Sequence, residues 1–167
     1  MTADTIFDAA SLTKVIATAP AIALLVEQGK LGLDDRVEKW IPGFKKNGKG
    51  AVTIRHLLTH TSGLRPGLSP RPEWSGVATA IDKAKAEPLT EQPDTKFIYS
   101  DINFILLGEI VRLVSGERLD LFVSKNIFQP LGMTDTGFLP PLAKRDRIAP
   151  TEQVGEVILH GEVHDPT

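Results

Sequence analysis

Apolar residues dominate both sides of the first long segment of the chain. Leu12, Val15, Ile22 and Val26 recur at helical spacing, and the residues between them are mostly apolar too. A helix that is apolar on every side is typical of a buried position, so we predict a core helix over residues 11–29. Pro20 conflicts with this prediction, because a proline inside a helix removes a backbone hydrogen bond and tends to kink the helix.

Further helix signals follow at intervals, with few strand signals. The patterns predict helices over about 34–40, from a cap at Thr53 to near Gly63, over 77–87, from Asp101 to Ser115, and over 119–128. Residues 65–76 read as an irregular loop and 87–100 as an extended segment, and the end, "QVGEVILHGEVHD", has some strand character. Because no repeat or internal boundary is visible, we predict one mostly helical domain over residues 1–167.

Composition excludes several classes of protein. The net charge of −2 gives no sign of the basic face of a nucleic-acid-binding protein, so we expect no nucleic acid partner. The absence of cysteine excludes disulfides, thiolate nucleophiles and cysteine-bound zinc. No uninterrupted apolar run reaches transmembrane length, since Glu27 and Lys30 close the longest one, and we expect no membrane span. The polar, acidic N-terminus does not resemble a signal peptide.

Ser11 and Lys14 stand at the start of the predicted core helix. A serine hydroxyl is a poor nucleophile unless a base lies beside it, and a lysine one helical turn away lies on the same face. To act as that base the lysine must be neutral, which burial or a nearby positive charge favours. The alternative is that Ser11 caps the helix and Lys14 extends into solvent.

Tyr99 is the single tyrosine of the chain and directly precedes Ser100 and Asp101 at a predicted helix start. A tyrosine can carry a proton between a nucleophile and a leaving group. The alternative is a core aromatic followed by two capping residues. Capping could explain the Ser11–Lys14 pair alone or the Tyr99–Asp101 stretch alone, but it explains less well why both occur in this order.

The series from Ser11-Leu12-Thr13-Lys14 to Tyr99-Ser100-Asp101 resembles the serine β-lactamase-related superfamily, within the branch of class C β-lactamases, penicillin-binding proteins and related esterases. "LVEQGKLGLDDRVEKWIPGF", "TIRHLLTHTSGL", "FIYSDINFILLGEIVRLVSG" and "NIFQPLGMTDTGF" support this, and the resemblance covers about residues 5–140. It implies a mostly α chain, namely the helical region of the α+β β-lactamase/transpeptidase-like fold with most of the antiparallel sheet missing.

The resemblance also implies roles for individual residues. Ser11 would attack an ester, β-lactam or peptide carbonyl, Lys14 would help to activate it, and Tyr99 would be the general base. Asp101 matches a substrate-binding position where an amide is common, and an ionised aspartate there accepts hydrogen bonds but donates none. The backbone N–H of Ser11 would form half of an oxyanion hole. This chemistry needs no cofactor or metal, and membership suggests a bacterial protein that is often periplasmic or secreted.

Other histidines invite less specific interpretations. His60 in "LTHTSGL" is chemically able to act as a base, but this stretch resembles a structural segment of the same family. His160, His164 and Asp165 have metal-like spacing, and we expect them to be surface residues and not metal ligands.

The family's third motif, a lysine or histidine, a small residue and a glycine on a sheet strand, is not found. Without the sheet, one side of the 11–29 helix must find another partner, and we expect a second copy or a rearrangement to cover it. Two functions remain open: a serine hydrolase that forms an acyl-enzyme with an ester or β-lactam substrate, or a non-catalytic fragment or binding module of the same family.

Overall fold

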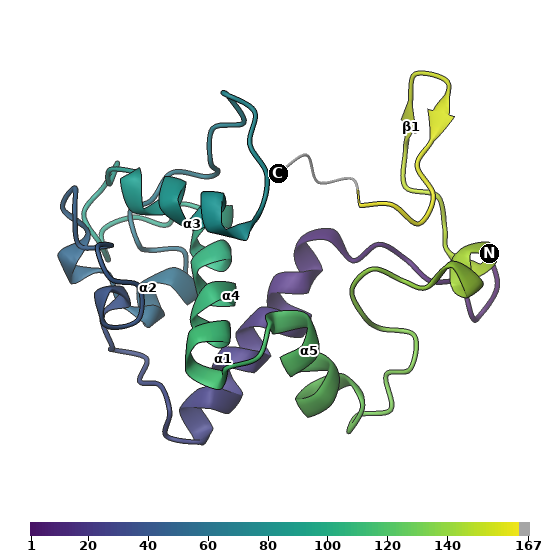
Figure 1. The fold of residues 1–167 in the computed structure, drawn as a ribbon, viewed down its shortest axis with the longest axis horizontal. Helices are drawn as coiled ribbons and strands as arrows, with labels where there is room; N and C mark the ends of the chain where they lie inside the picture. The colour runs from purple at the N-terminus through teal and green to yellow at the C-terminus, as the bar shows by residue number, and fades with distance from the viewer. Residues whose placement is uncertain (164–167) are drawn as a thin grey trace.

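The computed structural model describes residues 1–163, and it is mostly helical (Figure 1). Its α-helices are α1 (Ala19–Glu27), α2 (Ile54–Leu58), α3 (Val77–Ala86), α4 (Asp101–Ser115) and α5 (Leu119–Val123). Short 3₁₀ turns occur at Ala10–Leu12, Val37–Lys39, Lys49–Ala51 and Leu142–Arg147, and π-helical turns at Lys14–Thr18 and Ser124–Phe128. The two short strands β1 (Gln153–Val154) and β2 (Val157–Ile158) pair antiparallel. The predicted mostly helical class is confirmed.

The first helical segment changes its winding twice. It starts as the 3₁₀ turn, continues as the π-helical turn and becomes regular only in α1. The π-helical turn ends just before α1, so Pro20 falls in the first turn of α1, where its missing N–H costs least. The helix ends at Glu27, and Gly29, two residues later, has a left-handed backbone with a φ of 67°.

Burial on every side is wrong for the beginning of this segment. Leu12 and Val15 are 60% and 63% exposed, whereas Ala21, Ile22 and Leu25 in α1 are fully buried. The open side carries apolar residues without a partner in the described chain, as expected for a helix that lacks the family's sheet. Whether a second copy covers that side remains a prediction.

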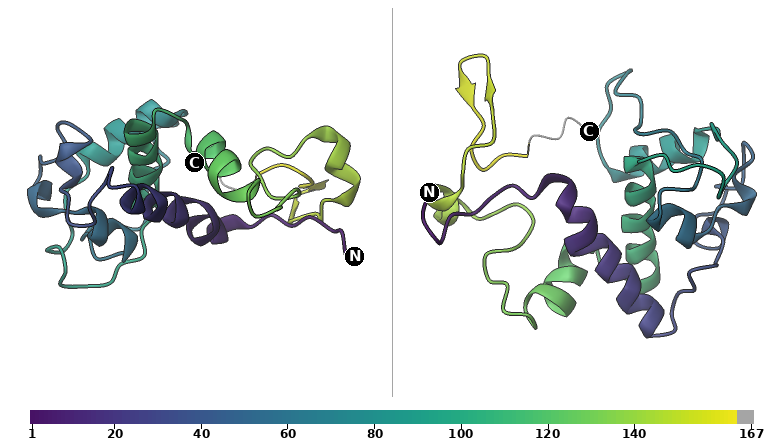
Figure 2. Two further views of the ribbon diagram at one scale, coloured as in Figure 1. Left: turned by 90° about the horizontal axis from the view of Figure 1, so that it is seen from below. Right: turned by 180° about the vertical axis from the view of Figure 1, so that it is seen from behind.

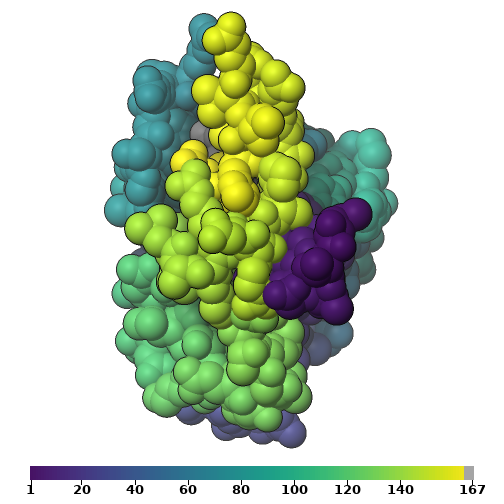
Figure 3. Space-filling model, turned by 90° about the vertical axis from the view of Figure 1, so that its right-hand side faces the viewer, coloured from purple at the N-terminus to yellow at the C-terminus, as the bar shows by residue number. Residues whose placement is uncertain are grey.

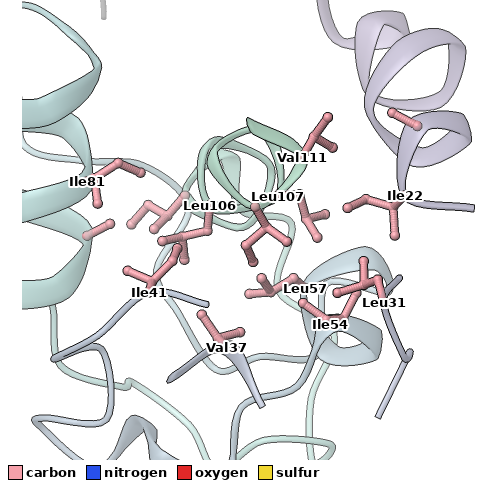
Figure 4. Packing of buried hydrophobic residues seen from close by; sticks show 14 of the residues in the cluster. Ile22, Leu31, Val37, Ile41, Ile54, Leu57, Ile81, Leu106, Leu107 and Val111 are labelled. Atoms are coloured by element: carbon pink, nitrogen blue, oxygen red, sulfur yellow. The ribbon is translucent and has the colours of Figure 1, made fainter. Parts of the chain in front are cut away.

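The hydrophobic core is built around α4. Its buried residues Ile102, Leu106, Leu107, Ile110 and Val111 recur at helical spacing. Figure 4 shows α1 and α2 on one side of this helix and α3 on the other, and side chains from all of them meet it. The core therefore fixes α4 relative to α1, which places the start of one helix near the start of the other.

One helical stretch, Ala10–Glu27, is long and apolar enough to cross a membrane by length and composition. The sequence prediction of no membrane span required an uninterrupted apolar run, whereas this stretch contains polar residues within a helix that is apolar on average. In the structure α1 packs against α4 and α5, and its central residues are buried within the protein. Buried core helices of soluble proteins share this length and composition.

The C-terminal hairpin stands apart from the helices and lies near the N-terminus (Figures 1 and 2). Ile6 and Ile148 form a parallel bridge, and the Arg147 guanidinium pairs with Asp4 and Asp135. Figure 3 shows the N-terminal segment beside the C-terminal residues on one face. These contacts anchor the segment that leads into Ser11.

Two predicted helices are shorter than expected. The predicted 34–40 helix is only the 3₁₀ turn Val37–Lys39, because Arg36 is extended and forms an isolated bridge with Thr53. The helix that follows the Thr53 cap ends at Leu58 rather than near Gly63, because His60 adopts a left-handed backbone with φ 57°. The cap itself is confirmed, since the Thr53 side chain accepts a hydrogen bond from the His56 amide.

Candidate active site

Ser11 lies in the 3₁₀ turn that opens the first helical segment. It does not act as a cap: the N-cap residue of this turn is Ala9, and just before it the Asp8 carboxylate accepts a hydrogen bond from the Ala10 amide at 2.8 Å. The Ala10 backbone is left-handed, with φ 42°, a conformation that costs an L-residue about 1–2 kcal/mol. The Ser11 amide is in the first turn, where helical N–H groups have no acceptor within the helix.

The Ser11 hydroxyl receives two hydrogen bonds. Lys14 Nζ donates to Ser11 Oγ at 3.1 Å, and the Tyr99 hydroxyl donates to the same oxygen at 2.8 Å. Lys14 reaches it from the next helical turn, as the spacing predicts. Tyr99 comes from a loop 88 residues further along the chain, so only the tertiary structure brings it here.

Lys14 forms an ion pair with Asp101, with 2.7 Å between Nζ and Oδ1. Partial burial lowers the pKa of Lys14, but the hydrogen bonds to Asp101 and Tyr99 and their charges outweigh burial and raise the pKa above its ordinary value. Lys14 is therefore protonated at neutral pH. The condition for Lys14 to act as a base, a neutral amine produced by burial, is not met.

Tyr99 is not a core aromatic, since it is 43% exposed. It lies two residues before α4, and its ring centre is 5.0 Å from the Lys14 ammonium. Its ring also lies against the imidazole of His60, at 4.6 Å between ring centroids. The loop position and this contact leave the hydroxyl free to reach Ser11.

Asp101 occupies the first position of α4, and Ser100 precedes it as the N-cap residue without a side-chain cap. The Asp101 side chain is 56% exposed, and one of its oxygens is taken by Lys14. The structure thus places Asp101 beside the lysine, where its carboxylate holds the ammonium in place.

An open pocket of about 450 Å³ adjoins these residues. Its lining includes Ser11, Lys14 and Tyr99 together with the apolar side chains of Leu12, Val15, Leu58 and Phe104, and His60 completes one wall. A substrate at Ser11 would meet a largely apolar surface. From the sequence, His60 was expected to belong to a structural segment, so its place in the pocket lining was not predicted.

Of the three residues with metal-like spacing near the C-terminal end, only His160 lies within residues 1–163. Within those described residues, no group of three or more His, Cys, Asp or Glu side chains is arranged to hold a metal ion. His160 Nε2 lies 2.7 Å from the Ile148 carbonyl, while His164 and Asp165 lie outside the described residues.

Comparison with known proteins assigns the chain to a family. The family model Beta-lactamase matches residues 1–159. The chain belongs to the Beta-lactamase family.

Similar proteins have related names and folds. The chain is 39% identical to a protein of Escherichia coli (strain K12) named "Putative D-alanyl-D-alanine carboxypeptidase", over 99% of this chain and 41% of that protein. It is similar in structure to a penicillin-binding protein homologue from Caulobacter crescentus, with 28% identity, a TM-score of 0.78, and coverage of 99% of this chain and 45% of that one. A class C β-lactamase shares 25% identity with a TM-score of 0.80, covering 96% and 44% of the two chains.

The chain thus spans about 41% of the length of the curated relative that it matches. This agrees with the predicted fold class, the helical region of the β-lactamase-like fold. The two short strands are the sheet elements found within residues 1–163.

Proposed function

We propose that this chain carries the nucleophile and proton-transfer groups of a serine hydrolase that works through an acyl-enzyme. One observation carries the proposal: Lys14 and Tyr99, from separate parts of the chain, both place a polar atom on Ser11 Oγ, at 3.1 and 2.8 Å. Membership in the Beta-lactamase family supports it. If Ser11 were only a helix cap and Tyr99 only a core aromatic, there would be no reason for the tyrosine hydroxyl to contact the serine hydroxyl.

In the proposed reaction Ser11 Oγ attacks the carbonyl carbon of the substrate. The Tyr99 oxygen accepts the Ser11 proton while the Tyr99 hydroxyl gives its own proton to the leaving group, as the bond from that group to the carbonyl carbon breaks. Water then attacks the acyl-enzyme: Tyr99 accepts one proton from the water and returns its own to Ser11 Oγ, which leaves as the acid is released. Each step conserves the proton that Ser11 or water supplies.

Lys14 acts in this scheme as a fixed positive charge and not as the base. Its ion pair with Asp101 keeps it protonated and places it near both Ser11 and Tyr99. A cation at this position favours negative charge as it develops on the reacting oxygens. The Ser11 amide, in the first helical turn, would be one of the donors to the carbonyl oxygen.

The apolar pocket wall favours substrates whose acyl group is apolar, and an ionised Asp101 cannot donate a hydrogen bond to a substrate amide carbonyl. Short-chain esters meet these requirements, and β-lactams are the alternative acyl donor. The D-alanyl-D-alanine carboxypeptidase name of the relative makes a peptide a third candidate. All three donate an acyl group to the same serine.

The test is the intact mass of the protein after incubation with a short-chain p-nitrophenyl ester and, separately, with a chromogenic cephalosporin. We expect an acyl adduct on Ser11 that Ser11→Ala abolishes and that Ser75→Ala, which alters an exposed serine, retains. Tyr99→Phe should slow acylation by about 100- to 10,000-fold, the usual contribution of general acid–base catalysis. A folded wild-type protein that forms no adduct would support the non-catalytic alternative.

A further inference from the structure

His60 holds the Tyr99 loop at three points. Its carbonyl accepts a hydrogen bond from the Ile98 amide at 2.8 Å, and its imidazole Nδ1 accepts one from the Ser100 amide at 3.1 Å. Between these two bonds, the rings of His60 and Tyr99 lie 4.6 Å apart at 33°. The residues on both sides of Tyr99 are therefore anchored to one histidine.

The hydrogen bonds also fix the protonation state of the imidazole. Because the Ser100 N–H points at Nδ1, that nitrogen carries a lone pair and the ring proton is on Nε2. The amide nitrogen of Asn103 lies 3.3 Å from the same Nδ1, and the Asn103 carbonyl accepts from the Ser62 hydroxyl at 2.6 Å. Ser62 and Asn103 are buried, so this network holds a neutral ring.

The charged surroundings of His60 also favour its neutral form. Burial lowers the pKa of His60, the positive charge of Lys14 lowers it further, and the carboxylate of Asp101 opposes both effects. Lys14 faces the ring from the π-helical turn, Asp101 from α4, and Tyr99 from its own loop. Together these groups leave the imidazole unprotonated at neutral pH.

Protonation of His60 would disrupt the anchor. Protonation at Nδ1 would turn this nitrogen from an acceptor into a donor. The Ser100 N–H and the Asn103 amide would then face another N–H group and lose their acceptor. The loop would have to move to relieve this contact, and Tyr99 would move with it. The 2.8 Å hydrogen bond between Tyr99 and Ser11 depends on the same loop.

We propose that His60 is the positioning residue for Tyr99: its neutral imidazole holds the Tyr99 hydroxyl on Ser11, and protonation releases it. This rests on the proposed function, in which Tyr99 moves the Ser11 proton. His60 itself transfers no proton in this account. It predicts that the rate of Ser11 acylation falls on the acidic side as His60 becomes charged.

The first test needs no activity. Since the chain has a single tyrosine, a ¹³C-labelled tyrosine ring reports on Tyr99 alone. In an acid titration followed by nuclear magnetic resonance, we expect the Tyr99 ring and the Ser100 amide to shift with the same midpoint as the His60 imidazole. Tyr99 and Ser100 signals that stay unchanged while His60 titrates would overturn the proposal.

A matched control removes a different imidazole, that of His56 in α2, four residues before His60. His56 contributes to the cap of α2 by contacting the Thr53 amide, and a glutamine at this position makes the equivalent contact. His56→Gln should therefore leave the shared titration of His60 and Tyr99 unchanged. If the Tyr99 shift disappeared in this variant, the shift would depend on His56 and not on His60, and the proposal would be overturned.

The second test follows Ser11 acylation against pH. His60→Asn keeps an acceptor on a side chain that tolerates the left-handed backbone, but it cannot be protonated in this range. It should lose the acidic fall in rate, whereas His60→Leu, without an acceptor, should be about 100-fold slower at every pH. A His60→Asn variant that keeps the wild-type acidic fall would overturn the proposal. Failure of the wild type to acylate would overturn the proposed function, and the tyrosine titration would still decide the role of His60.

Discussion

Gly63 holds the segment that leads to Tyr99 at very close range. Its carbonyl accepts hydrogen bonds from the Thr90 amide at 2.8 Å, from the Thr90 hydroxyl at 3.0 Å, and from the Glu91 amide at 3.4 Å. Its backbone is left-handed, with φ 79°, and a Cβ added there would lie 2.0 Å from the Glu91 carbonyl oxygen. A side chain at this position cannot be accommodated without moving the 90–91 backbone.

We predict that Gly63→Ala destabilises the protein by about 3–5 kcal/mol. The left-handed backbone accounts for about 1–2 kcal/mol of this. Moving the 90–91 backbone out of contact loses two or three hydrogen bonds to the Gly63 carbonyl, at about 1 kcal/mol each. This loss is a large part of the roughly 5–15 kcal/mol that stabilises a typical domain.

The assay is urea unfolding at fixed pH, beside two alanine variants that separate the contributions. Gly116 has a similar φ of 78° with no atom within 4 Å of an added Cβ, so Gly116→Ala measures the backbone cost alone. Gly67 has open space and no positive φ, so Gly67→Ala should be nearly neutral. If Gly63→Ala loses no more stability than Gly116→Ala, the close approach of the Glu91 carbonyl is not a constraint and the reasoning is refuted.

Three further changes have expected results. Asp101→Asn should lower the pKa of Lys14, because the carboxylate that raises this pKa is gone. As the pH rises, the variant should therefore lose its charged lysine, and with it acylation activity, at a lower pH than the wild type. A pH–rate profile of acylation would measure this. The pKa of Asp135 is about 2 because Arg147 and a neighbouring lysine hydrogen-bond to it, so its stabilising contribution is present above about pH 4 and is lost as pH falls toward 2. Arg147→Ala should return that pKa toward 3.8, as a carboxyl ¹³C titration would measure. Leu107→Ala, in the fully buried core, should cost about 2–5 kcal/mol in urea unfolding.

Each of these has a contrary outcome. An unchanged Lys14 pKa in Asp101→Asn would mean that the ion pair does not set the charge of the lysine. An Asp135 pKa that stays near 2 without Arg147 would assign the shift to other neighbours. A loss below about 1 kcal/mol for Leu107→Ala would show that the core around α4 relaxes to fill the space.

Much of the fold follows from local patterns. The helices α3 and α4 lie close to their predicted bounds because their apolar residues recur at helical spacing, and α4 ends at Gly116, as a left-handed glycine predicts. The Thr53 cap is likewise a local signal that the structure confirms. Where the prediction failed, at 34–40 and beyond Leu58, distant partners decided the backbone: the bridge from Arg36 to Thr53, and the contacts that hold His60 left-handed.

The sequence by itself determined which residues can do chemistry, because Ser11 and Lys14 lie one helical turn apart and Tyr99 precedes a helix start. Only the tertiary structure decided that these groups meet, since the core around α4 brings residues 88 positions apart to 2.8 Å. It also decided their charges. Asp101 beside Lys14 helps to hold the pKa of that lysine above its ordinary value, and burial next to the lysine lowers the pKa of His60. Charge depends on the distances between side chains and on burial, and spacing along the chain specifies neither when the partners lie far apart in sequence.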